Sequence, residues 1–206
     1  KDYDFTTYSD DETRTQVIKK TTAYMSVWMY TVREFEDAID DCEVGNAANN
    51  DGSVHAWDEG VAFYTGSLEG TDGSGSGKLI AALADKRCEN FGTCSGTDGI
   101  SGTSNVNTAL LTEFQAGRNE LIVFNCAAVR PILTRVVSLM SIPLIQGTLR
   151  YAYKMGVQGP AGANSATAAT MNTYNAEGVV FASAVLPLVA SCSSGAAKTI
   201  WEAMTL

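Results

Sequence analysis

The stretch YMSVWMYTVREFEDAI, residues 24–39, decides the fold class. Apolar side chains recur in it every three or four residues, at Tyr24, Val27, Trp28, Thr31, Phe35, Ala38 and Ile39. This spacing is typical of one face of an amphipathic α-helix. Upstream, Ser9 is followed by a run of acidic residues, which is typical of a helix start. The sequence therefore predicts a long helix from about Ser9 to Cys42.

Further helices are expected after glycine-rich turns. Ser53 can cap a helix from about Val54 to Leu68. The run from Gly70 to Gly77 has too much backbone freedom for regular structure and predicts a loop. A shorter helix should follow from about Lys78 to Asn90.

The second half of the chain is also helical in pattern. From about Ser104 to Met140 we expect a long helix kinked at Pro131, and Pro143 should separate it from a shorter one ending near Met155. The remaining predicted helices are one bent by Pro187 and ending near Ala190, and a last one over about 196–204. No window alternates like a half-buried strand. We predict an all-α, up-and-down helical bundle of about six or seven helices with Gly-rich loops and at least one disulfide.

Composition limits the classes of partner. With 206 residues, 45% of them hydrophobic, residues 1–206 can form a single helical-bundle domain, with 1–23 as an N-terminal extension. The net charge of -9 repels phosphate backbones and anionic membrane surfaces, so no nucleic acid partner is expected. Arg130 and Arg135 interrupt the longest apolar run, so the chain is not expected to span a membrane.

The five cysteines indicate disulfides and an oxidising, extracytoplasmic compartment. None forms a CxxC pair, and with a single histidine the set does not fit a zinc ribbon or finger. Cys88 and Cys94, flanked by glycines, are the first pair that we expect to be bridged. Cys126 lies in an apolar stretch and could equally be a buried free thiol.

The only histidine lies in a pattern typical of a metal ligand. Asp58 and Glu59 follow His55 at i+3 and i+4, so the three side chains can share one helix face. A histidine and carboxylates one turn apart recur in helical-bundle metal sites. The alternative is that His55 caps the helix and that the two acids are first-turn residues favoured by the helix dipole.

Other helices add carboxylates to this candidate site. Glu177 falls within an apolar face, where a carboxylate is costly unless it is paired or ligating. The predicted metal ligands are His55, Asp58, Glu59 and Glu177, helped by Glu34, Glu36 and Glu120. Such oxygen ligands suit iron, which is the tentative metal. Four tyrosines on helices that also carry acids could supply phenolate for ferric iron, although most should be core residues: Tyr24, Tyr30, Tyr64 and Tyr174. Arg130 is expected to be buried and paired with one of the acids.

The sequence does not indicate an enzyme. It has no Gly-x-Ser-x-Gly elbow, and its lone histidine would have to be the base of any triad. The segment from Gly73 to Lys78 lacks the spacing of a phosphate-binding loop.

Three runs resemble a known family. They are WDEGVAFYTGSLEG (57–70), KLIAALADKRC (78–88) and PLIQGTLRYAY (143–153), and they resemble the algal iron-assimilating proteins, also known as high-CO2-inducible periplasmic proteins. The resemblance implies a secreted algal protein of the periplasmic space or cell surface that helps to capture iron outside the plasma membrane, without enzymatic activity. A membrane transporter or a larger extracellular assembly would be its partner. The alternative function is a structural or docking module that holds no metal.

Overall fold

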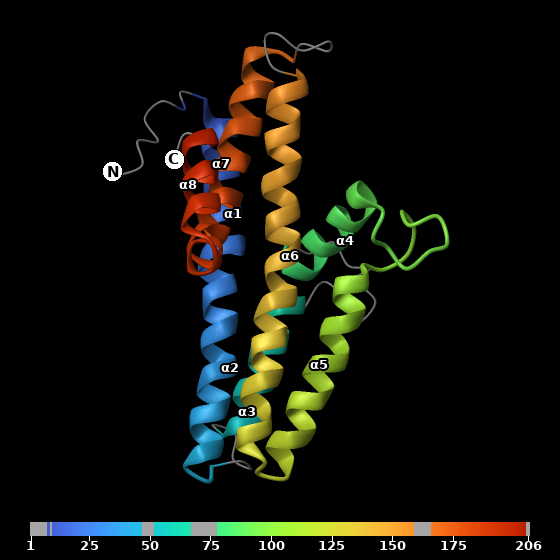
Figure 1. Cartoon of the computed structure of the whole chain (residues 1–206), viewed down its shortest axis with the longest axis vertical. Helices are drawn as coiled ribbons and strands as arrows, with labels where there is room; N and C mark the ends of the chain where they lie inside the picture. The colour runs from blue at the N-terminus through green and yellow to red at the C-terminus, as the bar shows by residue number, and fades with distance from the viewer. Residues whose placement is uncertain (1–7, 9, 47–51, 67–77, 159–165, 205–206) are drawn as a thin grey trace. The chain divides into compact units, whose positions relative to one another are not determined.

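The chain is all-α, as predicted (Figure 1). The structure, a computed structural model, describes residues 8, 10–46, 52–66, 78–158 and 166–204. The elements are α1 (Asp11–Thr21), η2 (Thr22–Val27), α2 (Trp28–Glu43), α3 (Ser53–Thr65), α4 (Ile80–Phe91), α5 (Asn105–Ile122), α6 (Cys126–Gln158), α7 (Ala168–Cys192) and α8 (Ser194–Ala203). Because α1, the π-helical η2 and α2 form one run, the described residues contain seven helices and no strand.

Contacts divide the chain into two compact units, which are described one at a time. The central unit comprises Ser26–Pro143. The terminal unit comprises Lys1–Met25 and Leu144–Leu206.

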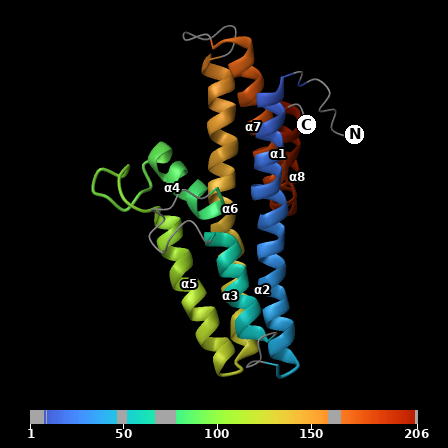
Figure 2. The ribbon, with the colours of Figure 1, turned by 180° about the vertical axis from the view of Figure 1, so that it is seen from behind.

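In the central unit, α3 packs between α2 and α5 (Figure 2). Its Trp57 is completely buried, and the indole Nε1 donates a hydrogen bond of 2.9 Å to the carbonyl of Phe114 on α5. Phe35 of α2 lies with its ring centroid 4.6 Å from that of Trp57. The helices approach closely because Gly117 faces Trp57, where a Cβ would lie 2.1 Å from Cζ2. This aromatic cluster is the core that the spacing in residues 24–39 predicted.

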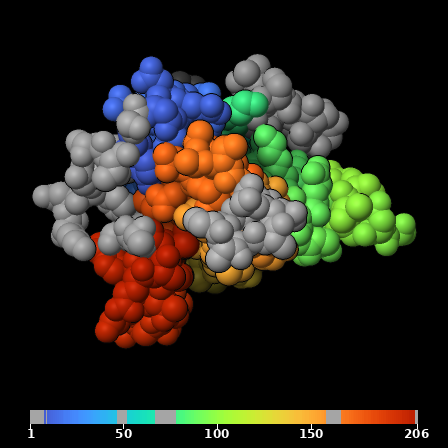
Figure 3. Space-filling model, turned by 90° about the horizontal axis from the view of Figure 1, so that it is seen from above, coloured from blue at the N-terminus to red at the C-terminus, as the bar shows by residue number. Residues whose placement is uncertain are grey.

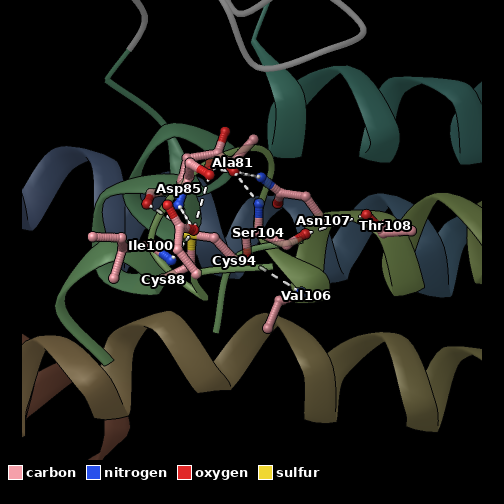
Figure 4. Close-up of a disulfide and its surroundings, with 11 residues drawn as sticks. Ala81, Asp85, Cys88, Cys94, Ile100, Ser104, Val106, Asn107 and Thr108 are labelled. Atoms are coloured by element: carbon pink, nitrogen blue, oxygen red, sulfur yellow. Dashed lines mark hydrogen bonds between the residues drawn. A yellow bond between two sulfur atoms is a disulfide. The ribbon is translucent and has the colours of Figure 1, made fainter. Parts of the chain in front are cut away.

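The Cys88–Cys94 disulfide closes a short loop after α4 (Figure 4). Asp85, one turn before Cys88, accepts hydrogen bonds from the Ser104 amide at 2.7 Å and from Asn107 Nδ2 at 2.9 Å. The loop is thereby fixed to the start of α5, and the predicted cysteine pair is confirmed. Desolvation by burial raises the pKa of the Asp85 carboxyl, and these hydrogen bonds offset part of that rise.

A second disulfide joins Cys42 to Cys126, 84 residues apart in sequence. The interpretation of Cys126 as a buried free thiol is therefore wrong. Cys192 is the free cysteine among the described residues, and it is exposed. The long bridge connects the end of α2 to the start of α6.

The predicted kinked helix over 104–140 is wrong, because the chain breaks between α5 and α6 at Val123–Asn125. Helix α6 instead runs through both Pro131 and Pro143. Each proline removes one backbone donor, a cost that a helix can bear without ending.

Helix starts differ in detail from the prediction. Helix α3 is capped by Gly52 without a side-chain hydrogen bond, and Ser53, the predicted cap, is its first residue and is buried. At α1, Asp10 accepts a hydrogen bond of 2.7 Å from the Thr13 amide. The predicted cap Ser9 and the predicted loop over 70–77 lie outside the described residues.

In the terminal unit, α7 packs against both α1 and α8, and its surface lies between theirs in Figure 3. Phe181 of α7 stacks on Tyr24 at 5.1 Å and on Tyr151 at 5.7 Å between ring centroids. Gly147 leaves room for Phe181, since a Cβ there would lie 2.8 Å from Cδ1. The core of this unit is therefore also aromatic.

Two helices, Cys126–Val157 and Ala168–Cys192, are long and apolar enough to cross a membrane by length and composition. Core helices of proteins that do not enter a membrane also pass this test. That the chain does not span a membrane stays a prediction.

Candidate metal-binding site

His55 and Glu59 meet on α3, as their spacing predicted. His55 Nε2 lies 3.2 Å from Glu59 Oε1, and both side chains are partly exposed. The imidazole and the carboxylate thus form a contact pair that an incoming cation can reach from solvent.

A second pair lies on α2. Tyr30 donates its hydroxyl hydrogen bond to Glu34, and this bond is the largest cause of a raised pKa for the Tyr30 phenol. The negative charges of Glu34, Glu59 and Asp37 raise this pKa further. Glu34 is buried, whereas Tyr30 is exposed and its ring packs edge-on against Phe63 of α3 at 4.9 Å. The Tyr30 phenol of α2 therefore lies within electrostatic reach of Glu59 on α3.

Three further predicted ligands of the central unit are held by other partners. Asp58 lies 3.6 Å from Arg118 Nε, and Glu36 lies 3.2 Å from Arg130 Nη1. Glu120 accepts a hydrogen bond of 2.7 Å from Asn125 Nδ2. Arg130 is exposed rather than buried, which corrects its predicted environment, because it lies on the solvent side of α6. Its predicted pairing with an acid is confirmed.

Glu177 belongs to the terminal unit. It is 8% exposed, and its carboxylate lies 3.2 Å from Lys20 Nζ of α1. A buried carboxylate was expected to need a partner, and this lysine is one. The ammonium group accounts for the placement of Glu177 without a metal ion.

Across the described ranges, no three side chains of His, Cys, Asp or Glu form a group that could hold a metal ion. The pairs His55–Glu59 and Tyr30–Glu34 remain as the candidate site, and the full predicted ligand set stays a prediction. Among these four residues, Tyr30 was the one missing from that set. Its signal in the sequence was a tyrosine one helical turn before an acid, Glu34.

An all-α fold with two disulfides defines the class of disulfide-stabilised helical proteins from oxidising compartments. A family model described as low iron-inducible periplasmic protein matches residues 7–187, and the chain belongs to this family. No curated protein and no solved structure matches it. The resemblance seen in the sequence is confirmed, and the protein is periplasmic.

Proposed function

We propose that the protein binds iron in the periplasm as cargo for iron assimilation and has no catalytic activity of its own. The observation that carries the proposal is the contact between α2 and α3 at Tyr30, whose ring packs against Phe63, one helical turn after Glu59. Carboxylate suits hard cations, and imidazole also suits iron. Phenolate is a hard, anionic oxygen donor, so this combination favours ferric iron.

The present contacts must be exchanged for metal bonds. Glu59 would release His55, and Glu34 would accept the metal in place of the Tyr30 proton. Because His55, Glu59 and Tyr30 are partly or well exposed, their side chains can rotate without disturbing the core. The net charge of -9 would also raise the local concentration of cations.

Binding should depend on pH. The pKa of Tyr30 is raised by Glu34 and its acidic neighbours, so a metal must displace a tightly held proton to gain the phenolate. Iron affinity should therefore rise with pH, and acidification should release the metal.

The test is a titration of the full chain with ferric nitrilotriacetate, followed by metal analysis and visible absorption. Ferric phenolate absorbs visible light, so the wild type should become coloured with about one iron per chain. Tyr30→Phe should lose the colour and at least tenfold in affinity. Tyr153→Phe, which changes an exposed tyrosine of α6, is the matched control. Unchanged colour in Tyr30→Phe would remove Tyr30 from the site.

Glu59→Gln and Glu177→Gln test separately whether each of these two glutamates is a metal ligand. Glu59→Gln should weaken iron binding, because it removes a charge from the α2–α3 site. Glu177→Gln tests the sequence prediction: unchanged binding leaves Glu177 to its ion pair with Lys20, and lost binding by a folded variant adds it to the ligands.

A docking module without metal is the second candidate function. It is favoured by large apolar side chains of the terminal unit that remain exposed, Leu149 and Tyr153 among them. If the protein holds no iron after incubation with it, the docking function is favoured over iron binding.

A further inference from the structure

Two helices of the central unit end in the same backbone motif. At the end of α2, the Asn46 amide donates to the Asp41 carbonyl at 2.9 Å, and the Gly45 amide donates to Cys42 at 3.0 Å. At the end of α5, the Asn125 amide donates to Glu120 at 2.9 Å, and the Phe124 amide donates to Leu121 at 3.1 Å. Both endings have the hydrogen-bond pattern of a Schellman motif.

The residue in the left-handed position differs between these endings. Gly45 has φ 80°, and Phe124 has φ 58°. Glycine adopts this conformation without steric cost. In phenylalanine the Cβ lies too close to the following carbonyl oxygen, which raises the free energy of the folded state. Phe124 remains half exposed, so little burial compensates for the strain. A strained residue that burial does not compensate is often found at a functional site, such as a binding surface.

Phe124 belongs to an exposed apolar surface, which we call the apolar tip. Its members and their exposed fractions are Val44 79%, Ile122 48%, Val123 68% and Phe124 51%. The two turns that carry them lie at the same end of the central unit (Figures 1 and 2). The Cys42–Cys126 disulfide holds these turns together with 5.7 Å between Cα atoms.

The polar groups beside the apolar tip are acidic or already paired. Arg130 lies 3.2 Å from Glu36 and 3.7 Å from Glu43. Glu120 accepts a hydrogen bond from the side chain of Asn125. Among the described residues of this group, one arginine is shared by two carboxylates, so the described part of the rim is net negative.

We propose that the apolar tip inserts into the surface of a zwitterionic lipid bilayer and holds the central unit at a membrane. Its four side chains are too few for a stable protein interface, which takes roughly 800 Å² and 20–30 residues from each partner. A second copy would also bring acidic rims together. A bilayer needs no matching pocket, and apolar side chains at a helix end can reach its interfacial region. The acidic rim favours a surface without net negative charge.

Vesicle flotation with the iron-free full chain tests the proposal without reference to metal binding. The wild type should float with phosphatidylcholine vesicles, and less of it should float when a quarter of the lipid is anionic phosphatidylglycerol. The double variant Val123→Ser/Phe124→Gly should lose at least tenfold in partitioning. Its glycine relieves the left-handed strain at position 124, which works against unfolding as a cause of the loss. Leu111→Ser, at an exposed position of α5, is the matched control and should bind as the wild type does.

Insertion depth is measured with Phe124→Trp. Its fluorescence should shift to the blue on phosphatidylcholine vesicles and be quenched by brominated lipid beyond the level of the wild type. Three results would overturn the proposal: no flotation, equal flotation of the double variant, or stronger flotation on anionic vesicles. If size-exclusion chromatography instead shows self-association that Phe124→Gly abolishes, the occupant is a second copy and the lipid proposal fails.

Discussion

Removal of the long disulfide should destabilise the central unit much more than removal of the short one. The Cys42–Cys126 bridge spans 84 residues, whereas Cys88–Cys94 spans 6. A cross-link lowers the entropy of the unfolded chain in proportion to the logarithm of the loop length, which gives about 4.6 kcal/mol for the long loop and about 2.3 kcal/mol for the short one. Replacing each pair by serine should therefore give two variants that differ by about 2.3 kcal/mol in free energy of unfolding.

The assay is urea unfolding followed by tryptophan fluorescence. Trp201 lies in the terminal unit, so a Trp201→Phe background leaves Trp28 and Trp57 to report on the central unit. The Cys42→Ser/Cys126→Ser variant should have the lower urea midpoint, and the slope of the transition should be similar in both variants. If the Cys88→Ser/Cys94→Ser variant is equally or less stable, loop entropy does not govern these bridges and the reasoning is refuted.

Two further predictions concern packing and pH. Gly117→Ala should destabilise the protein by about 1–3 kcal/mol in urea unfolding, because its Cβ would overlap Trp57. Gly156→Ala in α6 is the control, because its added Cβ would meet no atom within 4 Å. It should stabilise the protein by up to about 1 kcal/mol. Equal effects of the two substitutions would contradict the packing argument. Burial raises the pKa of Asp85 above 3.8, so the folded state holds that proton more tightly and stability falls as pH rises through the raised pKa. Asp85→Asn should flatten this decline in melting temperature as the pH rises above 3.8, and an unchanged profile would show that another group causes it.

The sequence predicted the helices better than their connections. The spacing of Trp28, Phe35 and Ile39 indicated a buried helix face, and all three side chains are buried. The break before Cys126 was missed because helix ends are usually marked by glycine, and here Phe124 takes the left-handed position. The prolines misled the prediction, since a packed helix tolerates the loss of a single hydrogen bond.

The candidate site could be predicted only as far as one helix determines it. The contact between His55 and Glu59 follows from their separation by one helical turn. That Tyr30 lies near Glu59 depends on which faces of α2 and α3 pack together, and a single sequence does not specify that. The pairing of Cys42 with Cys126 depends on the same three-dimensional arrangement.

The two disulfides are nested, and this topology governs how the protein acquires them. Cysteines that pair in chain order would join Cys42 to Cys88, whereas the native bridges are Cys88–Cys94 inside Cys42–Cys126. Cys42 must therefore stay reduced until Cys126 is available, or a wrong bridge must be exchanged through a mixed disulfide. The exposed Cys192 is an additional thiol that can enter such exchange. Correct pairing thus requires that bridge formation at Cys42 be either delayed or reversible.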